Sequence, residues 1–291
     1  MFTGVYTALV TPFDENRNVD KESLKKIVQF QLNKGISGLV PMGTTGESPT
    51  VSHDENMEVV EIVVKEVNGK VPVIAGTGSN STDEAIRMTK IAKAIGADAS
   101  LQVSPYYNKP TQEGLYRHFM TIADTVDLPI MVYNIKGRTG VNIETDTLMK
   151  LAKHENIVAV KEASGDLNQM MDVIRQKPSD FAVLSGDDNM ALPLTLMGGN
   201  GVVSVVSNII PHWMEELIQA GRKGDVEKAK TIHYELLPLF KSMFLETNPI
   251  PVKWAMSEMG LVKDMFRLPL CSPAEETKVK IREVLKNQGL I

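Results

Sequence analysis

Residues 157–161 read Ile-Val-Ala-Val-Lys, a short apolar run that ends in a lysine. A continuous rather than alternating apolar run is typical of a strand that is buried on both faces, as in a parallel sheet. Similar runs occur at residues 5–10, 38–42, 71–75, 99–103, 130–133, 181–184 and 201–206. Together these runs predict eight parallel strands.

Amphipathic stretches separate the apolar runs. Three of them, at residues 21–34, 54–67 and 82–95, repeat apolar residues with the period of an α-helix. Ser81 is a candidate N-cap, and glycines that favour helix termination follow the three stretches at Gly35, Gly69 and Gly96. Eight strand–helix units predict an α/β fold, a (β/α)8 TIM barrel, with an open doubly wound sheet as the alternative.

The pattern changes after residue 206. Helices are expected near residues 212–220, 225–243, 249–259 and 273–288, without a further strand. We therefore expect residues 1–224 to form the barrel with the catalytic site and residues 225–291 to form a small C-terminal helical bundle. The length of 291 residues fits one barrel, which needs about 250 residues, plus this extension.

Composition excludes several classes of protein. The net charge of −5 and the scattered basic residues argue against a nucleic-acid partner. No apolar run approaches the roughly 18 residues of a membrane span, and the N-terminus lacks the pattern of a signal peptide. Cys271 is the single cysteine, so no internal disulfide is possible. A cytoplasmic protein is expected.

Polar residues gather at the predicted C-terminal ends of the strands, where barrels of this kind carry their active sites. These ends read Gly43-Thr44-Thr45-Gly46-Glu47-Ser48, Gly76-Thr77-Gly78-Ser79-Asn80, Ser104-Pro105-Tyr106-Tyr107-Asn108, Tyr133-Asn134, Lys161-Glu162 and Ser185-Gly186-Asp187-Asp188. The opposite ends carry ordinary glycine, proline and charged residues. The sequence therefore predicts one polar barrel mouth.

Lys161 is the candidate nucleophile. Burial at the mouth would lower its pKa from the usual value of about 10.4 and supply the neutral amine that attacks a carbonyl. The alternative is a lysine that extends from the strand end toward solvent. Tyr133 ends the preceding strand, so its phenol could relay protons beside that amine, or it could be a core tyrosine.

Two further features suit carboxylates. The turn at Thr44-Thr45 offers hydroxyls and free backbone N–H groups, although it could be a plain βα turn. Arg138 has a planar fork for bidentate binding, although a surface arginine is the usual alternative. No metal is predicted, because none of the five histidines has suitable spacing from Asp187-Asp188. No glycine string makes a dinucleotide fingerprint, so no cofactor is expected.

These strings resemble the pyruvate-dependent lyase family of dihydrodipicolinate synthase and N-acetylneuraminate lyase over the whole chain. The resemblance rests on residues 43–48, Tyr133-Asn134, Lys161-Glu162-Ala163 and Ser185-Gly186-Asp187-Asp188. Residues 105–114, 138–140 and 248–253 match the synthase branch in particular. The resemblance implies condensation of pyruvate with aspartate 4-semialdehyde to 4-hydroxy-tetrahydrodipicolinate, on the diaminopimelate route to lysine.

The resemblance also implies roles for residues. Lys161 would form an imine with pyruvate, while Tyr133 and Thr44 would relay protons. Tyr107 would complete the relay from a neighbouring subunit of a homotetramer, a dimer of dimers. The implied substrate-binding residues are Thr45 for the pyruvate carboxylate, Arg138 for the semialdehyde carboxylate, and Gly186 and Val203.

Many members of the family are inhibited by lysine at a cleft between subunits. The matching positions here are Ser48, Pro49, His53, Asn56, Asn80, Glu84 and Tyr106. Strongly inhibited members often carry histidine where this chain has Asn56, so we expect weak to moderate inhibition. Lys136 stands where the family usually has proline, which leaves the loop that carries Arg138 less preorganised.

Two other functions are compatible with the sequence. An aldolase for sialic acid or a 2-keto-3-deoxy sugar acid would keep Lys161 and Tyr133 but need hydroxyl-binding groups in place of Arg138. A non-catalytic sensor of a keto acid or amino acid would have no need of the complete proton relay. Activity with a sugar aldehyde would select the first function, and failure to trap an imine with pyruvate would favour the second.

Overall fold

A computed structural model describes residues 2–291, and in this part of the chain eight parallel strands form one sheet. The strands are β1 (Gly4–Ala8), β2 (Gly38–Val40), β3 (Ile74–Gly76), β4 (Ala99–Val103), β5 (Ile130–Asn134), β6 (Ile157–Glu162), β7 (Ala182–Ser185) and β8 (Gly201–Ser204). Their order is β2-β1-β8-β7-β6-β5-β4-β3, and a parallel bridge between Leu39 and Val73 joins the two ends. The predicted (β/α)8 barrel is confirmed, and the open doubly wound sheet is wrong.

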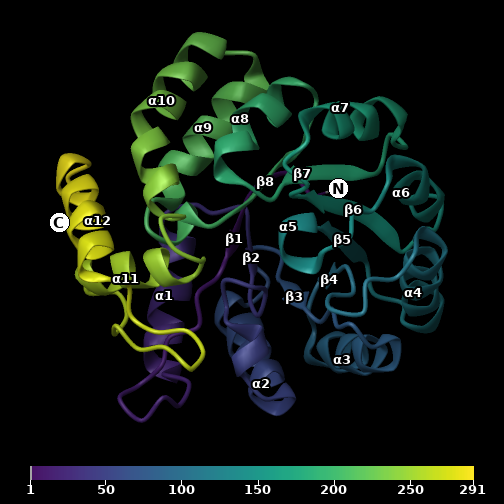
Figure 1. Cartoon of the computed structure of the whole chain (residues 1–291), viewed down its shortest axis with the longest axis horizontal. Helices are drawn as coiled ribbons and strands as arrows, with labels where there is room; N and C mark the ends of the chain where they lie inside the picture. Colours follow the sequence, from purple (N-terminus) through teal and green to yellow (C-terminus); the bar gives the residue numbers. More distant parts are fainter. Residues whose placement is uncertain (1) are drawn as a thin grey trace.

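Helices surround the strands (Figure 1). They are α1 (Lys21–Asn33), α2 (His53–Val67), α3 (Thr82–Ile95), α4 (Gln112–Thr125), α6 (Thr145–Leu151), α7 (Leu167–Gln176), α8 (Asp188–Leu196) and α9 (Pro211–Lys223). Short turns η1 (Ser48–Thr50), α5 (Lys136–Thr139) and η2 (Val206–Asn208) follow three of the strands. Inward-facing side chains from all eight strands, including Val40, Leu101, Met131 and Val203, fill the barrel. The interior is therefore a packed core, and the chemistry is confined to its mouth.

The helix ends follow the predicted chemistry with one exception. Gly35, Gly69 and Gly96 have φ values of 78°, 72° and 95°, as expected for residues that follow a helix. Ser81 does precede α3, but its side chain makes no capping hydrogen bond. Instead its N–H donates to Ser79 Oγ at 3.1 Å, so a local turn replaces the predicted cap.

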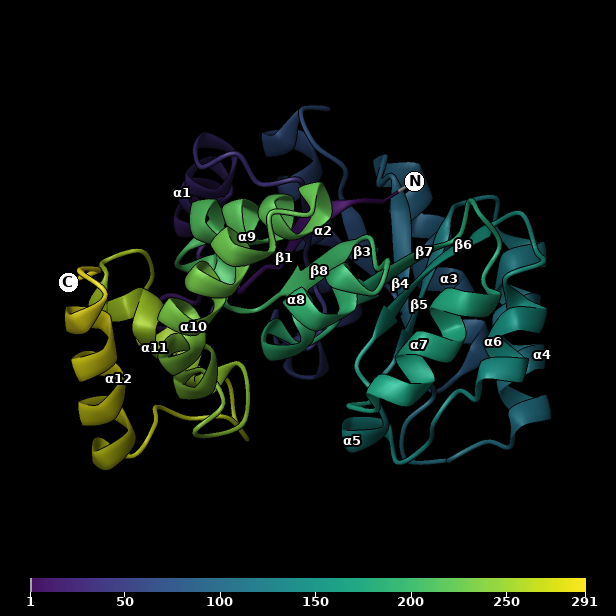
Figure 2. The same cartoon turned by 90° about the horizontal axis from the view of Figure 1, so that it is seen from above.

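The C-terminal helices α10 (Val226–Ser242), α11 (Ile250–Glu258) and α12 (Glu275–Asn287) lie to one side of the barrel, as Figure 2 shows. Helix α10 packs against α8 and α9, and α12 packs against α10 and α11. Leu236, Trp254 and Ile281 from these helices join the same hydrophobic cluster as Val5 of β1. A domain boundary between residues 224 and 225 stays a prediction. None of the described helices is long and apolar enough to cross a membrane.

Candidate active site

Lys161 lies near the C-terminal end of β6 and is 5% exposed. Burial lowers the pKa of its amine to about 7, an effect that the negative charge of Asp188 opposes and the positive charge of Arg138 reinforces. At neutral pH a large fraction of such amines is uncharged, and the uncharged form is the nucleophile. The position and the titration of Lys161 thus suit attack on a carbonyl carbon.

Tyr133 stands beside Lys161, because the two residues are register partners on β5 and β6. The lysine Nζ lies 4.2 Å from the centre of the tyrosine ring. Burial raises the pKa of the Tyr133 phenol to about 12, opposed by the charge of Arg138 and by a hydrogen bond with the Thr44 side chain. The phenol therefore holds a proton next to the amine and has a second hydroxyl to exchange it with.

The turn after β2 carries Thr44 and Thr45. The N–H groups of Gly46 and Glu47 donate back into the turn, to the carbonyls of Gly43 and Thr44, both at 3.1 Å. Within residues 2–291 the N–H groups of Thr44 and Thr45 have no acceptor. Gly46 lets the turn pack closely, because a Cβ there would lie 2.9 Å from the Met42 nitrogen. The result is a small concave site with free donors that suits a carboxylate.

Arg138 lies in the short helix α5, directly after β5. Its Nη2 donates to the backbone carbonyl of Asn248 at 3.0 Å, which directs an exposed guanidinium toward the mouth. Its charge acts on both Lys161 and Tyr133, as their pKa values show. Arg138 therefore presents a cation, which suits a carboxylate, at the same mouth as the Lys161 amine.

Gly186 and Val203 lie close to the lysine in different ways. A Cβ on Gly186 would lie 2.8 Å from Ala163 Cβ and 3.1 Å from Lys161 Cε, so glycine keeps the space beside the lysine stem open. Val203 is fully buried on β8 and belongs to the cluster that fills the barrel with Tyr133. Gly186 thus shapes the surroundings of the amine directly, whereas Val203 forms part of the packed floor.

A cavity of about 390 Å³ opens at the mouth. Its walls include Thr44, Tyr133 and Arg138. They also include most of the predicted lysine-binding positions, namely Ser48, Pro49, His53, Asn56, Glu84 and Tyr106. Lys161, Thr45, Gly186 and Val203 are not part of these walls. Thr44, Tyr133 and Arg138 thus border the same hollow as most of the effector positions, whereas Lys161 lies behind its wall, beside Tyr133.

Local contacts hold three of the effector residues, His53, Glu84 and Asn80. His53 Nε2 lies 3.1 Å from Glu84 Oε1, and its Nδ1 lies 2.7 Å from Arg87 Nη2. Asn80 does not line the cavity, and its Nδ2 donates to the carbonyl of Tyr106 at 3.1 Å. In a single chain the predicted set is therefore assembled except for the side chain of Asn80.

Tyr107 does not join the other predicted catalytic residues within one chain. Its side chain is 91% exposed, and its φ of 70° is unusual for a residue other than glycine. A strained backbone that presents a bare aromatic ring to solvent is compatible with a contact outside the chain. The expectation that Tyr107 acts in a neighbouring subunit stays a prediction.

Sequence reasoning assigned no role to two residues of this region. Asp188 is 1% exposed, accepts hydrogen bonds from the N–H groups of Val205 and Val206, and has a pKa raised by burial to about 6. Asn248 Nδ2 donates to Thr45 Oγ1 at 3.0 Å. Both residues belong to strings that the family resemblance already contains, but their contacts follow from the fold rather than from spacing in the sequence.

Comparison with known proteins agrees with this geometry. The Dihydrodipicolinate synthetase family matches residues 1–288. The 4-hydroxy-tetrahydrodipicolinate synthases of Thermodesulfovibrio yellowstonii and Endomicrobium trichonymphae are 52% and 54% identical to this chain, and the matches cover 100% of each protein. A crystal structure of the dihydrodipicolinate synthase from Acinetobacter baumannii complexed with pyruvate is 45% identical, with a TM-score of 0.98 over 100% of both chains. The chain belongs to the dihydrodipicolinate synthetase family.

Proposed function

We propose that this chain condenses pyruvate with L-aspartate 4-semialdehyde to 4-hydroxy-tetrahydrodipicolinate, in the diaminopimelate route to lysine. The single observation that carries the proposal is Lys161, a buried strand-end amine whose pKa is lowered to about 7. The names of the relatives support the product, the pyruvate complex of a similar solved structure supports pyruvate, and the family resemblance supplies the semialdehyde. The enzyme is a Schiff-base lyase.

The first step joins the amine to pyruvate. The neutral Lys161 amine attacks the C2 ketone, and the resulting carbinolamine loses one water to become an imine. Loss of that water requires a proton on the departing hydroxyl. We assign this role to the Tyr133 phenol, supported by its ring centre 4.2 Å from the amine, and Thr44 returns a proton to it.

The second step forms the carbon–carbon bond. The imine loses a proton from C3 to give an enamine, whose C3 attacks the aldehyde carbon of the semialdehyde. The substrate amino group then attacks the imine carbon, which closes the ring and releases Lys161. The overall reaction liberates one water, and no redox cofactor or metal takes part in the balance.

Two anion-binding groups bind the carboxylates of the two substrates separately. The Thr45 hydroxyl and the free N–H groups of the turn bind the pyruvate carboxylate, while Arg138 binds the carboxylate of the semialdehyde. Gly186 leaves room for the three-carbon imine beside the lysine stem. Tyr107 completes the proton relay from a second subunit. The two subunits form a dimer, and two such dimers form a homotetramer in the cytoplasm.

Lysine is the proposed effector, bound at a cleft between subunits to which the cavity wall around Glu84 and Tyr106 contributes. Glu84 would meet an amino group, and Asn80 and Tyr106 would hold the carboxylate, with Ser48, His53 and Asn56 as neighbours. We expect weak to moderate inhibition. Activity that does not change at millimolar lysine would contradict this assignment.

The test of the function is turnover with defined pairs of substrates. Pyruvate is supplied with either aspartate 4-semialdehyde or a sugar aldehyde, and the products are identified by mass spectrometry. We expect product with the semialdehyde and none with a Lys161→Arg variant, whose guanidinium cannot form the imine. Turnover of the sugar aldehyde alone would identify a sugar-acid aldolase and contradict the proposal.

A further inference from the structure

The hydroxyl of Thr45 is oriented by a residue from the far end of the chain. Asn248 Nδ2 donates to Thr45 Oγ1 at 3.0 Å, and the two residues are 6% and 3% exposed. A threonine hydroxyl has one hydrogen to donate and two lone pairs to accept with. Because one lone pair is taken by Asn248, and no residue within 2–291 accepts the hydrogen, the hydroxyl still has its hydrogen to donate.

The same asparagine also contacts Arg138. Its backbone carbonyl accepts from Arg138 Nη2 at 3.0 Å. A guanidinium has five N–H donors, so this contact fixes its direction and leaves most of its fork for a carboxylate. Asn248 thus contacts both anion-binding groups of the mouth, Thr45 in the turn after β2 and Arg138 in α5.

The segment that carries Asn248 is itself held to the threonine turn. Lys253 Nζ in α11 lies 2.6 Å from Glu47 Oε1, and both side chains are completely buried. Glu47 follows Thr45 by two positions in the sequence. Two contacts, Thr45 with Asn248 and Glu47 with Lys253, therefore join the threonine turn to residues 248–253. Together they hold the Asn248 side chain against Thr45.

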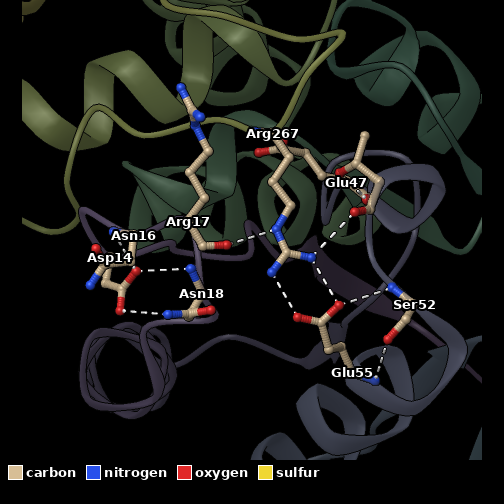
Figure 3. A network of polar contacts seen from close by, with 9 residues as sticks. Asp14, Asn16, Arg17, Asn18, Glu47, Ser52, Glu55 and Arg267 are labelled. Atoms are coloured by element: carbon tan, nitrogen blue, oxygen red, sulfur yellow. Dashed lines mark hydrogen bonds and ion pairs between the residues drawn. The ribbon is translucent and has the colours of Figure 1, made fainter.

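Arg267 adds a third tie, which Figure 3 shows. Its backbone N–H donates to Glu47 Oε2 at 3.4 Å. Its guanidinium donates to both carboxylate oxygens of Glu55, at 2.7 and 2.9 Å, and its Nε donates to the carbonyl of Arg17 at 2.8 Å. The C-terminal segment is thus anchored on both sides of the turn, and Asn248 occupies a fixed position.

We propose that Asn248 is a positioning residue, which holds the Thr45 hydroxyl as a donor toward the pyruvate carboxylate and aligns Arg138 with it. The inference rests on the proposed function, because it requires pyruvate to bind at the mouth. It predicts that Asn248 acts on the affinity for pyruvate through Thr45. Loss of the Asn248 amide therefore matters little once the Thr45 hydroxyl is absent.

The experiment is a double-mutant cycle of Asn248→Ala, Thr45→Val and the double variant. The dissociation constant of pyruvate is read from the concentration dependence of borohydride trapping on Lys161. We expect Asn248→Ala to raise this constant about tenfold, the effect of one lost hydrogen bond. The double variant should differ from Thr45→Val by no more than about twofold, because the two residues act as one unit.

Independent, multiplying effects of the two substitutions would overturn the inference, as would an Asn248→Ala variant with unchanged pyruvate affinity. Asn248→Leu repeats the test with the volume of the side chain retained, in case the alanine variant unfolds. A leucine variant that binds pyruvate normally would equally overturn it. Absence of any adduct in the unsubstituted protein would instead refute the proposed function, so the two failures are distinguishable.

Discussion

Replacement of Lys253 by methionine would leave the Glu47 carboxylate buried without its cation. The two side chains are completely buried, with Nζ 2.6 Å from Oε1, and the rings of Phe13 and Phe266 lie 4.0 and 5.0 Å from the same Nζ. Methionine keeps most of the apolar stem but removes the charge, and with it the cation–π contacts of Nζ with the two rings. The Lys253→Met variant therefore measures the loss of the buried cation.

The size of the effect follows from burial. Removal of one partner of a buried ion pair costs about 3–5 kcal/mol. Unfolding entropy is about 2.1 cal/mol/K per residue, so for 291 residues it is about 0.6 kcal/mol/K. The unfolding midpoint should fall by about 5–8 °C. The double variant Glu47→Gln with Lys253→Met removes both charges, so it should recover most of that loss.

Thermal unfolding followed by circular dichroism at pH 7 measures these midpoints. The matched control is Lys25→Met, because Lys25 forms a solvent-exposed pair with Glu22 at 2.8 Å and should show no measurable change. A Lys253→Met variant that unfolds at the same temperature as the unsubstituted protein would refute the reasoning. A double variant as unstable as the single one would refute it as well.

Four further predictions concern the candidate site. The rate of imine formation should rise with pH through about 7, because Lys161 reacts as the free amine. Asp188→Asn should move this rise to lower pH, because the Asp188 carboxylate raises the pKa of Lys161. Trapping rates measured across pH test this, and a rise at the same pH as in the unsubstituted protein would contradict it. Gly186→Ala should slow trapping by about tenfold or more, because its Cβ would lie 3.1 Å from Lys161 Cε. An unchanged rate would show that the added methyl group does not disturb the Lys161 side chain. Tyr107→Phe and Lys161→Ala chains should each be inactive, and mixing them with subunit exchange should restore turnover if Tyr107 acts in a second subunit. A mixture that stays inactive after exchange would exclude this.

Much of the barrel could be predicted from local patterns, but strand ends could not. The run at 5–10 outlasts β1, which ends at Ala8, because Leu9 and Val10 are buried without being in the strand. The run at 71–75 begins before β3 for the same reason, since buried Val73 precedes Ile74. An apolar run shows that its residues are buried, but it does not distinguish a strand from a buried loop that continues it.

In the candidate site, too, local sequence patterns predicted some residues and missed the long-range contacts. Lys161, Tyr133 and Thr44 could be proposed because each closes or follows a strand, and parallel strands bring their ends together. The contacts of Thr45 with Asn248 and of Glu47 with Lys253 span 203 and 206 residues. No period or spacing links such distant positions, so these contacts required the structure.

The most direct test of the central claim is borohydride reduction in the presence of pyruvate, followed by intact mass and peptide mapping. A covalent pyruvyl adduct should appear on Lys161, because this amine is buried at the mouth with a pKa lowered to about 7. It should be absent from the Lys161→Arg variant. An unmodified chain, or an adduct that maps to another lysine, would contradict the claim that Lys161 is the Schiff-base nucleophile.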